Sequence, residues 1–129
     1  MISMKDCFDE ALLNGECCSQ IITRVALEMC GKRIEEMVKA MFGMCEGTRY
    51  GGTCGLVTAA ACVLAMEKSR EDAIALTEEF TDWFTELFGS MECNDLTEGS
   101  PATHLSFCRD LSFSCLEELA ILMGWETGE

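Results

Sequence analysis

Several residue types and motifs are rare or missing in this 129-residue sequence. It has one proline, Pro101, and one histidine, His104, so a histidine-rich metal site is excluded and a Cys–His nucleophilic pair would have to use His104. The sequence has no C-x-x-C, C-x-x-C-H, G-x-S-x-G or G-x-x-x-x-G-K-[ST] motif. The signatures of thioredoxin-like sites, zinc ribbons, ferredoxin clusters, c-type haem, serine hydrolases and phosphate-binding loops are therefore missing. Any cysteine site must be assembled from distant parts of the chain.

Basic residues and long apolar runs are also scarce. Residues 1–65 carry six Lys or Arg and eight Asp or Glu, whereas residues 66–129 carry three and fifteen, and the net charge is −14. Nucleic acids and anionic membrane surfaces require a basic patch, so we expect neither as a partner. The uncharged stretch 56–66 is shorter than the roughly 20 residues of a membrane helix, and the N-terminus shows no secretory apolar region. These absences predict a cytoplasmic protein with an acidic surface.

Cysteine, in contrast, is abundant, with ten residues in the chain. In a cytosolic protein this density indicates metal binding, thiol redox chemistry or an anaerobic cell that tolerates thiols. Free cysteine is also an ordinary small core residue. We interpret the four that fall on apolar helix stripes as packing residues: Cys18, Cys45, Cys62 and Cys115. Cys7 and Cys30 lie near helix ends, and the pattern does not decide between packing and chemistry for them.

The apolar spacing predicts an all-α fold of about six helices, in a single cysteine-rich domain over residues 1–129. Apolar side chains recur at helical spacing in segments 3–13, 17–29, 33–44, 55–66, 70–88 and 102–123. Ser69 is a natural N-cap for the helix 70–88. The helix 55–66 carries no charge and has small residues that allow close approach, so we expect the other helices to pack around it.

Cys54 has the most favourable local setting for chemistry. The glycine-containing loop 51–53 delivers it to the start of the uncharged helix. Helix starts present unpaired backbone N–H groups and the positive end of the helix dipole, and both favour a thiolate over a thiol. Cys17 lies in the first turn of the helix 17–29 and has the same advantage. Arg49 and Tyr50, in the preceding loop, are candidates to assist. Cys54 is therefore the first candidate for the reactive residue.

Four segments in order resemble a known family. Segments 14–20, 52–59, 88–93 and 107–111 look like the C-GCAxxG-C-C family, which is named after its four separated cysteines and described as redox-active. The resemblance covers most of the chain, from about residue 8 to residue 119. Carried over by position, it makes Cys17, Cys54, Cys93 and Cys108 the family cysteines. It implies a redox site more directly than a particular reaction.

The chain departs from the family pattern at two places. Leu56 and Ala59 stand where the C-G-A-x-x-G motif has smaller residues, and bulkier side chains there would push a neighbouring backbone away. Cys18 stands beside Cys17, where the family usually has alanine. The sequence therefore leaves open which of Cys17 and Cys18 is equivalent to the family cysteine.

Three hypotheses follow, in order of preference. The first is a redox protein in which Cys54 is the attacking thiolate and Cys17, Cys93 or Cys108 resolves it in a reversible disulfide. That mechanism needs no cofactor, and its redox partner protein is unknown. In the second, the same four cysteines bind zinc or an iron–sulfur cluster, which four thiolates from separate segments can do. The third is a helical interaction or homo-oligomerisation module whose cysteines only pack.

Overall fold

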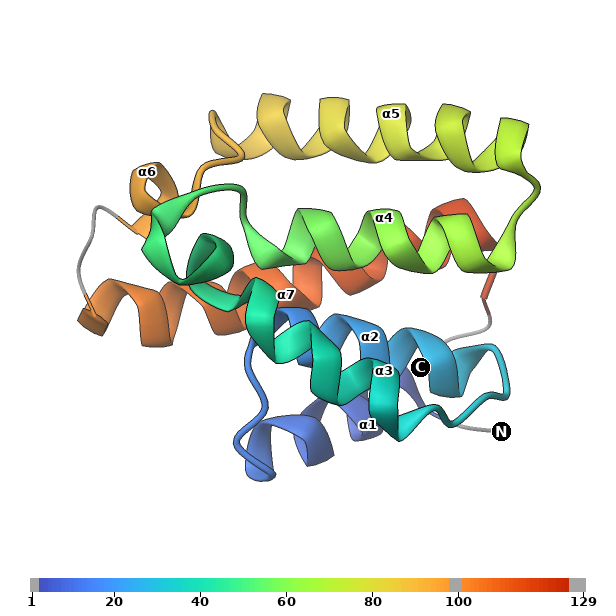
Figure 1. The fold of residues 1–129 in the computed structure, drawn as a ribbon, viewed down its shortest axis with the longest axis horizontal. Coiled ribbons are helices and arrows are strands. Elements are labelled where there is room, and N and C mark those ends of the chain that lie inside the picture. Colours follow the sequence, from blue (N-terminus) through green and yellow to red (C-terminus); the bar gives the residue numbers. More distant parts are fainter. Residues whose placement is uncertain (1–2, 98–100, 126–129) are drawn as a thin grey trace.

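The chain folds into helices joined by short connections (Figure 1). The computed structural model describes residues 3–97 and 101–125, without the side chains of 101–107. The α-helices of this part are α1 (Met4–Leu13), α2 (Cys18–Met29), α3 (Glu35–Ala40), α4 (Gly55–Glu67), α5 (Arg70–Phe88), α6 (Cys93–Thr97) and α7 (Pro101–Met123). Two shorter turns are η1 (Met41–Met44) and η2 (Gly47–Gly51). Extended pairing in the described residues is limited to one isolated bridge between Thr53 and Glu92. The predicted all-α fold is confirmed.

Helix boundaries agree with the sequence where a cap residue defines them. The Ser69 hydroxyl accepts a hydrogen bond from the Asp72 backbone N–H at 3.2 Å, so it satisfies one of the free donors at the start of α5. Gly89 ends the same helix with a φ of 83°, in the left-handed region that glycine adopts most easily. Both ends of α5 therefore lie where the sequence predicts them.

The predicted helix 33–44 is instead two short pieces, α3 and η1. The Ser19 hydroxyl of α2 donates a hydrogen bond to the Met41 backbone carbonyl at 2.6 Å. That carbonyl is the first of η1, and Gly43 two residues later has a low helix propensity. A continuous α-helix is therefore weakened at this point, and the chain tightens before it reaches Cys45.

Helix α4 packs between α2 and α5, and α7 lies behind it (Figure 1). Its buried residues include Leu56, Ala59, Val63 and Leu64. Leu56, Ala59 and Leu64 join a core that extends from α1 to α7 and takes Phe80 and Phe84 from α5. The face of α4 that carries Ala65 reaches the surface. The start of α4 is buried in this core, and Cys54 lies directly before it as the N-cap residue.

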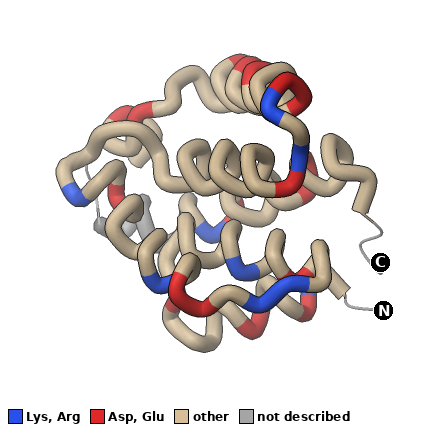
Figure 2. The backbone as a smooth tube through the Cα atoms, turned by 45° about the vertical axis from the view of Figure 1, so that its right-hand side comes forward, with Lys and Arg blue, Asp and Glu red and all other residues tan. Residues whose placement is uncertain are grey.

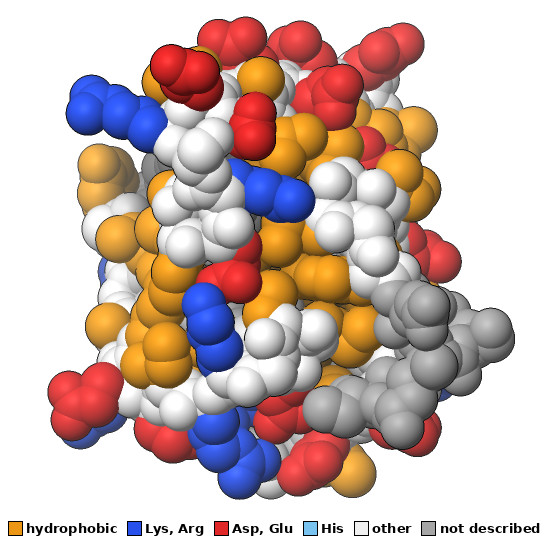
Figure 3. Space-filling model, turned by 90° about the vertical axis from the view of Figure 1, so that its right-hand side faces the viewer, with side chains coloured by type: hydrophobic (Ala, Val, Ile, Leu, Met, Phe, Trp, Pro, Cys, Tyr) orange, Lys and Arg blue, Asp and Glu red, His pale blue; other side chains and the backbone are white. Residues whose placement is uncertain are grey.

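The surface is acidic on one side and locally apolar at one end. Acidic residues recur along α5, where the backbone is coloured red (Figure 2). At the end of the molecule where α4 stops and α5 begins, apolar side chains reach the surface between charged ones (Figure 3). None of the helices described is both long enough and apolar enough to cross a membrane. Helix α5 carries six of the 23 acidic residues of the sequence.

Candidate functional site

Cys17 and Cys45 form a disulfide between the start of α2 and the end of η1. Cys17 is the N-cap residue of α2 and Cys45 follows η1 directly, with the two Cα atoms 6.2 Å apart. Ser19 holds this junction together, because its hydroxyl lies 2.9 Å from Cys45 Sγ while it donates to the Met41 carbonyl. The sequence assigned Cys45 to packing, and the structure corrects this: Cys45 is the bonded partner of Cys17.

The segments that carry Cys54 and Cys93 are joined by backbone hydrogen bonds. The Cys54 N–H donates to the Met91 carbonyl at 2.7 Å, and the Cys93 N–H donates to the Gly52 carbonyl at 2.7 Å. These two bonds flank the Thr53–Glu92 bridge. Two of the predicted site residues, from distant parts of the sequence, are therefore held side by side.

Cys18 and Cys108 complete a group of free thiols around Cys54. A Cβ atom placed on Gly55, the residue after Cys54, would lie 3.2 Å from Cys18 Sγ, so the Cys18 sulfur sits against the start of α4. Cys108, on α7, interacts electrostatically with Cys18, Cys54 and Cys93. Cys18, rather than Cys17, is thus the residue of the adjacent pair that lies among the other thiols.

Burial opposes the ionisation of these thiols. It raises the pKa of Cys54 to about 12, and the neighbouring Cys18 thiol adds to the shift while the Leu56 N–H opposes it. Burial likewise raises the pKa of Cys108 to about 12 and that of Cys18 to about 11. The pKa of Cys93 is also raised, first by burial and then by Glu46.

The effect of the helix start on Cys54 therefore has the expected sign but is too weak. Cys54 is 3% exposed, and the cost of burying a charge exceeds what one backbone N–H recovers. The expectation that this position favours the thiolate is wrong for this conformation. Cys54 is therefore an enclosed thiol whose ionisation is opposed by burial.

An open pocket of about 440 Å³ leads from solvent to the disulfide. Both disulfide residues line it, together with the thiol-bearing residues Cys18 and Cys108. Arg49 and Arg109 are among its charged residues. The pocket thus brings a disulfide and two free thiols to one solvent-accessible space.

The pocket is bordered by a strained turn. Glu46, Thr48 and Arg49 have φ values of 57°, 60° and 72°, a left-handed conformation that residues with a Cβ rarely adopt. Arg49 holds the turn through hydrogen bonds to the Glu46 carboxylate at 2.9 Å and the Phe42 carbonyl at 2.8 Å. Its guanidinium also lies 3.9 Å from the centre of the Phe42 ring. Arg49 therefore lines this pocket, whereas Tyr50 is 80% exposed, and a role of either residue in assisting Cys54 stays a prediction.

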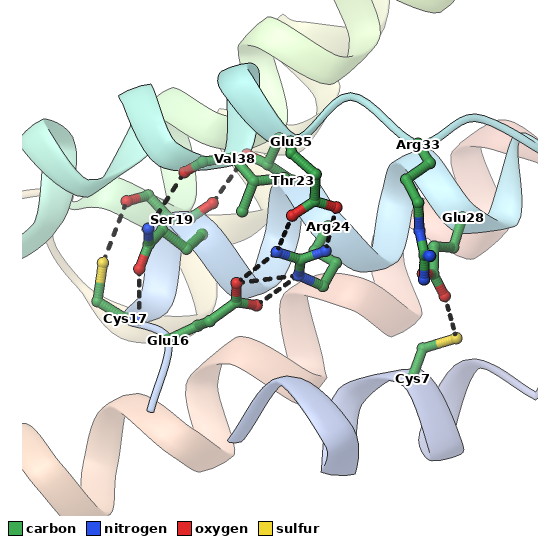
Figure 4. Close-up of polar contacts among 11 residues, drawn as sticks. Cys7, Glu16, Cys17, Ser19, Thr23, Arg24, Glu28, Arg33, Glu35 and Val38 are labelled. Atoms are coloured by element: carbon green, nitrogen blue, oxygen red, sulfur yellow. Dashed lines mark hydrogen bonds and ion pairs between the residues drawn. The ribbon is translucent and has the colours of Figure 1, made fainter. Parts of the chain in front are cut away.

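A network of ion pairs around Arg24 holds Glu16, the pocket residue that precedes Cys17 (Figure 4). Arg24 of α2 donates to both carboxylate oxygens of Glu16 at 2.8 and 2.9 Å, and it pairs with Glu35 at the start of α3 as well. Glu16 immediately precedes Cys17 and lines the pocket. Arg24 therefore anchors the chain that carries the disulfide and connects it to α3.

The arrangement does not fit the predicted four-cysteine metal site. The Cys17 sulfur is bonded to Cys45, so it cannot act as a metal ligand in this state. Within the described side chains, no group of three or more His, Cys, Asp or Glu residues is placed to hold a metal ion. His104 falls among the α7 side chains outside the described set.

Two residues of this arrangement were not among the predicted site residues. Cys45 carried a signal in the sequence, since it lies between the apolar stripe and the glycine-rich loop that leads to Cys54. Cys18 carried another, its adjacency to Cys17. Neither signal identifies a partner, because pairing depends on how α2 and η1 meet in space.

Comparison with known families gives one match. A family model described as "Putative redox-active protein (C_GCAxxG_C_C)" matches residues 16–121. The matched region includes the disulfide, the thiol group and the strained turn. No curated protein and no solved structure matches the chain.

Proposed function

The chain belongs to the C_GCAxxG_C_C family, and from this premise we propose that it is a thiol–disulfide redox protein whose exchangeable bond is Cys17–Cys45. The observation that carries the proposal is the position of that bond on an open pocket beside free thiols. A thiolate can attack a disulfide only if it can approach one of the sulfurs, and the pocket supplies that approach. In our proposal, the Cys17–Cys45 bond is the redox-active bond of this family member.

Cys54, Cys93 and Cys108 act in our proposal as the inner thiols of the same site. They lie among the other thiols, and burial raises the pKa of each, so in our proposal they react after the outer disulfide has opened. Cys54 keeps the role of attacking thiolate once movement of the neighbouring turn exposes it. The residues that resemble the family pattern thus contribute to one site in two layers, an outer disulfide and an inner thiol group.

The overall reaction is a two-electron exchange with an external dithiol. One thiolate of the reductant attacks the Cys17–Cys45 bond and forms a mixed disulfide, and its second thiol displaces the protein sulfur. The reductant ends as a disulfide, and Cys17 and Cys45 end as thiols with two protons taken from the reductant. We place this reaction in the cytoplasm, where a disulfide is transient and functional rather than a permanent staple.

Thiol counting across a series of dithiothreitol redox buffers tests the proposal. The oxidised protein, denatured in the presence of an alkylating reagent, should show eight free thiols and the reduced protein all ten. The change should be reversible with a single midpoint, and Cys45→Ser, which removes the sulfur shared by the proposed pairings, should abolish it. Cys62→Ser changes a half-buried residue of α4 and serves as the control. It should still lose two thiols on oxidation, with seven free thiols in the oxidised protein and nine in the reduced protein. Ten reactive thiols at every buffer ratio, with no reversible step, would contradict the proposed function.

A further inference from the structure

Cys17 and Cys18 are neighbours in the sequence but differ in state. Cys17 is bonded to Cys45, whereas Cys18 keeps a free thiol. All three residues line the same pocket. A disulfide and a potential attacking sulfur therefore line one pocket, and the attacking residue is the sequence neighbour of one of the bonded cysteines.

The Cys18 sulfur lies beside the segment that carries Cys45. The backbone N–H of Glu46, the residue after Cys45, donates to Cys18. On the other side of Cys45, the Met44 carbonyl and the Cys18 sulfur both lie against Gly55, at 2.8 and 3.2 Å from the position of a Cβ there. Cys45 is thus flanked on both sides by residues that adjoin the Cys18 sulfur.

Two further features favour attack by Cys18. Its sulfur accepts backbone N–H groups from Ser19 and Glu46, which oppose the effect of burial. Burial still raises the pKa of Cys18 to about 11, so the exchange proceeds through a small thiolate population and should quicken as the pH rises. Cys45 also leads directly into the left-handed turn formed by Glu46, Thr48 and Arg49. A non-glycine residue in this conformation costs free energy, and Glu46, the first of the three, follows Cys45 directly.

We propose that Cys18 is the internal resolving thiol, which takes Cys45 from Cys17 by thiol–disulfide exchange. The Cys18 thiolate attacks Cys45 Sγ, the Cys18–Cys45 bond forms, and the Cys17–Cys45 bond breaks with its electron pair on Cys17. The proton lost by Cys18 passes to solvent, and Cys17 takes one from solvent, so the numbers of disulfides and thiols do not change. This step rests on the proposed function and needs no added oxidant or reductant.

The exchange would connect the two layers of the site. It moves the disulfide from the pocket wall to a position beside Cys54, Cys93 and Cys108, where an inner thiol can continue the exchange. It also frees Cys17 at the N-terminus of α2, where helix-start N–H groups favour its thiolate. Cys17 thereby becomes the sulfur that meets an external partner.

Alkylation of the oxidised, native protein tests this exchange. Oxidised protein, freed of reductant and oxidant, is incubated with N-ethylmaleimide, digested without reduction and mapped by mass spectrometry. We expect Cys17 to become alkylated while Cys45 becomes linked to Cys18, with one disulfide per chain throughout. In Cys18→Ser the alkylation of Cys17 should be lost, whereas Cys62→Ser should retain it. Cys17 that stays blocked in the oxidised wild-type protein would overturn the exchange.

A second variant gives the same answer from the opposite side. Cys17→Ser, oxidised with hydroxyethyl disulfide, should form the Cys18–Cys45 bond, and its far-ultraviolet circular dichroism should show that the helices remain. A folded Cys17→Ser protein in which Cys45 stays a free thiol or bonds only to the reagent would overturn the exchange. That result would not affect the proposed redox role of the Cys17–Cys45 bond in the wild-type protein. A wild-type protein that never forms Cys17–Cys45 would overturn the proposed function itself, and the exchange with it.

Discussion

The two ends of α2 carry cysteines in different surroundings. At its N-terminal end, Cys17 is bonded to Cys45, and Cys18 lies among other thiols. At its C-terminal end, Cys30 is the C-cap residue, and Cys7 of α1 donates a hydrogen bond to Glu28 at 3.0 Å (Figure 4). The first end offers backbone N–H groups and a second sulfur, whereas the second offers carboxylates. Cysteine number alone is therefore a poor guide to redox chemistry in this chain.

Burial and neighbouring carboxylates disfavour thiolates at the C-terminal end of α2. Burial, followed by the hydrogen bond to Glu28, raises the pKa of Cys7 to about 12. Burial and a hydrogen bond to Glu67 also raise the pKa of Cys30. Thiolates are the reacting species, so a thiol whose pKa is raised by a neighbouring carboxylate reacts more slowly. Neither Cys7 nor Cys30 is bonded to another cysteine. The two positions that the sequence left undecided are in this protected group.

The largest expected effect is a difference in alkylation rate between the two ends. In reduced protein at pH 8, Cys7 should react about a thousandfold more slowly than in unfolded protein, because each unit of raised pKa lowers the thiolate fraction about tenfold. Cys17, half-buried at the pocket, should react much faster than Cys7. Mass spectrometry after timed iodoacetamide pulses measures both rates. Equal rates at Cys7 and Cys17 would remove the contrast between the ends.

The same raised pKa values fix the direction of the pH dependence. Unfolded thiols begin to lose protons near pH 9, whereas Cys7, Cys54 and Cys108 stay protonated in the folded protein to about pH 12. Between these values the folded state binds more protons, so the free energy of unfolding falls as the pH rises. Urea unfolding of reduced protein at pH 8, 9 and 10 should show this decline. A free energy that rises over this range would contradict it.

Removal of the disulfide should have the next largest effect. Cys45→Ser should lower the free energy of unfolding of the oxidised protein by about 3–4 kcal/mol, because the bond closes a loop with a sequence separation of 28 residues. The variant and wild type should be nearly equal once both are reduced. Urea unfolding with and without dithiothreitol measures this, with Cys62→Ser as the control. A loss that persists unchanged in reduced protein would assign the effect to packing of Cys45 instead.

Local sequence patterns predicted the helices well because their determinants are local. Apolar spacing and caps such as Ser69 define α5 to the residue, and the 55–66 stripe gives α4 within one residue at its end. The break between α3 and η1 was missed because it depends on Ser19, a residue of another helix that binds the Met41 carbonyl. Fold class thus followed from the sequence, and the exception has a tertiary cause.

The site was harder to predict for the same reason. The family resemblance brought Cys54, Cys93 and Cys108 together, but it gave no way to choose between Cys17 and Cys18. That choice depends on how the start of α2 meets α4 and the end of η1. The turn after Cys45 is left-handed at Thr48 and Arg49, and the sequence does not signal this conformation because neither residue is glycine. The high pKa of Cys54 likewise comes from enclosure by other segments, which the local helix-start argument does not include.

Close approach at the N-terminal end of α2 can be tested at Gly55. A methyl group there would lie 2.8 Å from the Met44 carbonyl and 3.2 Å from Cys18 Sγ, so Gly55→Ala should cost about 1–3 kcal/mol of unfolding free energy. Gly43→Ala is the matched control, because a Cβ at Gly43 meets no atom within 4 Å. Urea unfolding and the yield of Cys17–Cys45 measure the effect. A Gly55→Ala protein as stable as Gly43→Ala would show that Cys18 is not pressed against α4.

The smallest expected effect separates the two carboxylates that share Arg24. The Glu16 side chain is 12% exposed and the Glu35 side chain 59%, although both accept short hydrogen bonds from the same guanidinium. Water replaces a lost partner more easily at an exposed position, so Glu16→Gln should cost about 1–2 kcal/mol of unfolding free energy and Glu35→Gln measurably less. Salt should reduce the smaller effect further.

The comparison of these variants also tests whether the network positions the disulfide. Glu16 precedes Cys17, so its loss should allow the start of α2 to shift and should slow re-formation of Cys17–Cys45 after reduction. Glu35 lies on α3, away from the sulfur atoms, and its variant should re-form the bond at the wild-type rate. Quenched alkylation during reoxidation measures both rates. If Glu16→Gln lowers stability but reoxidises at the wild-type rate, Arg24 supports the fold at the N-terminal end of α2 without orienting its redox bond.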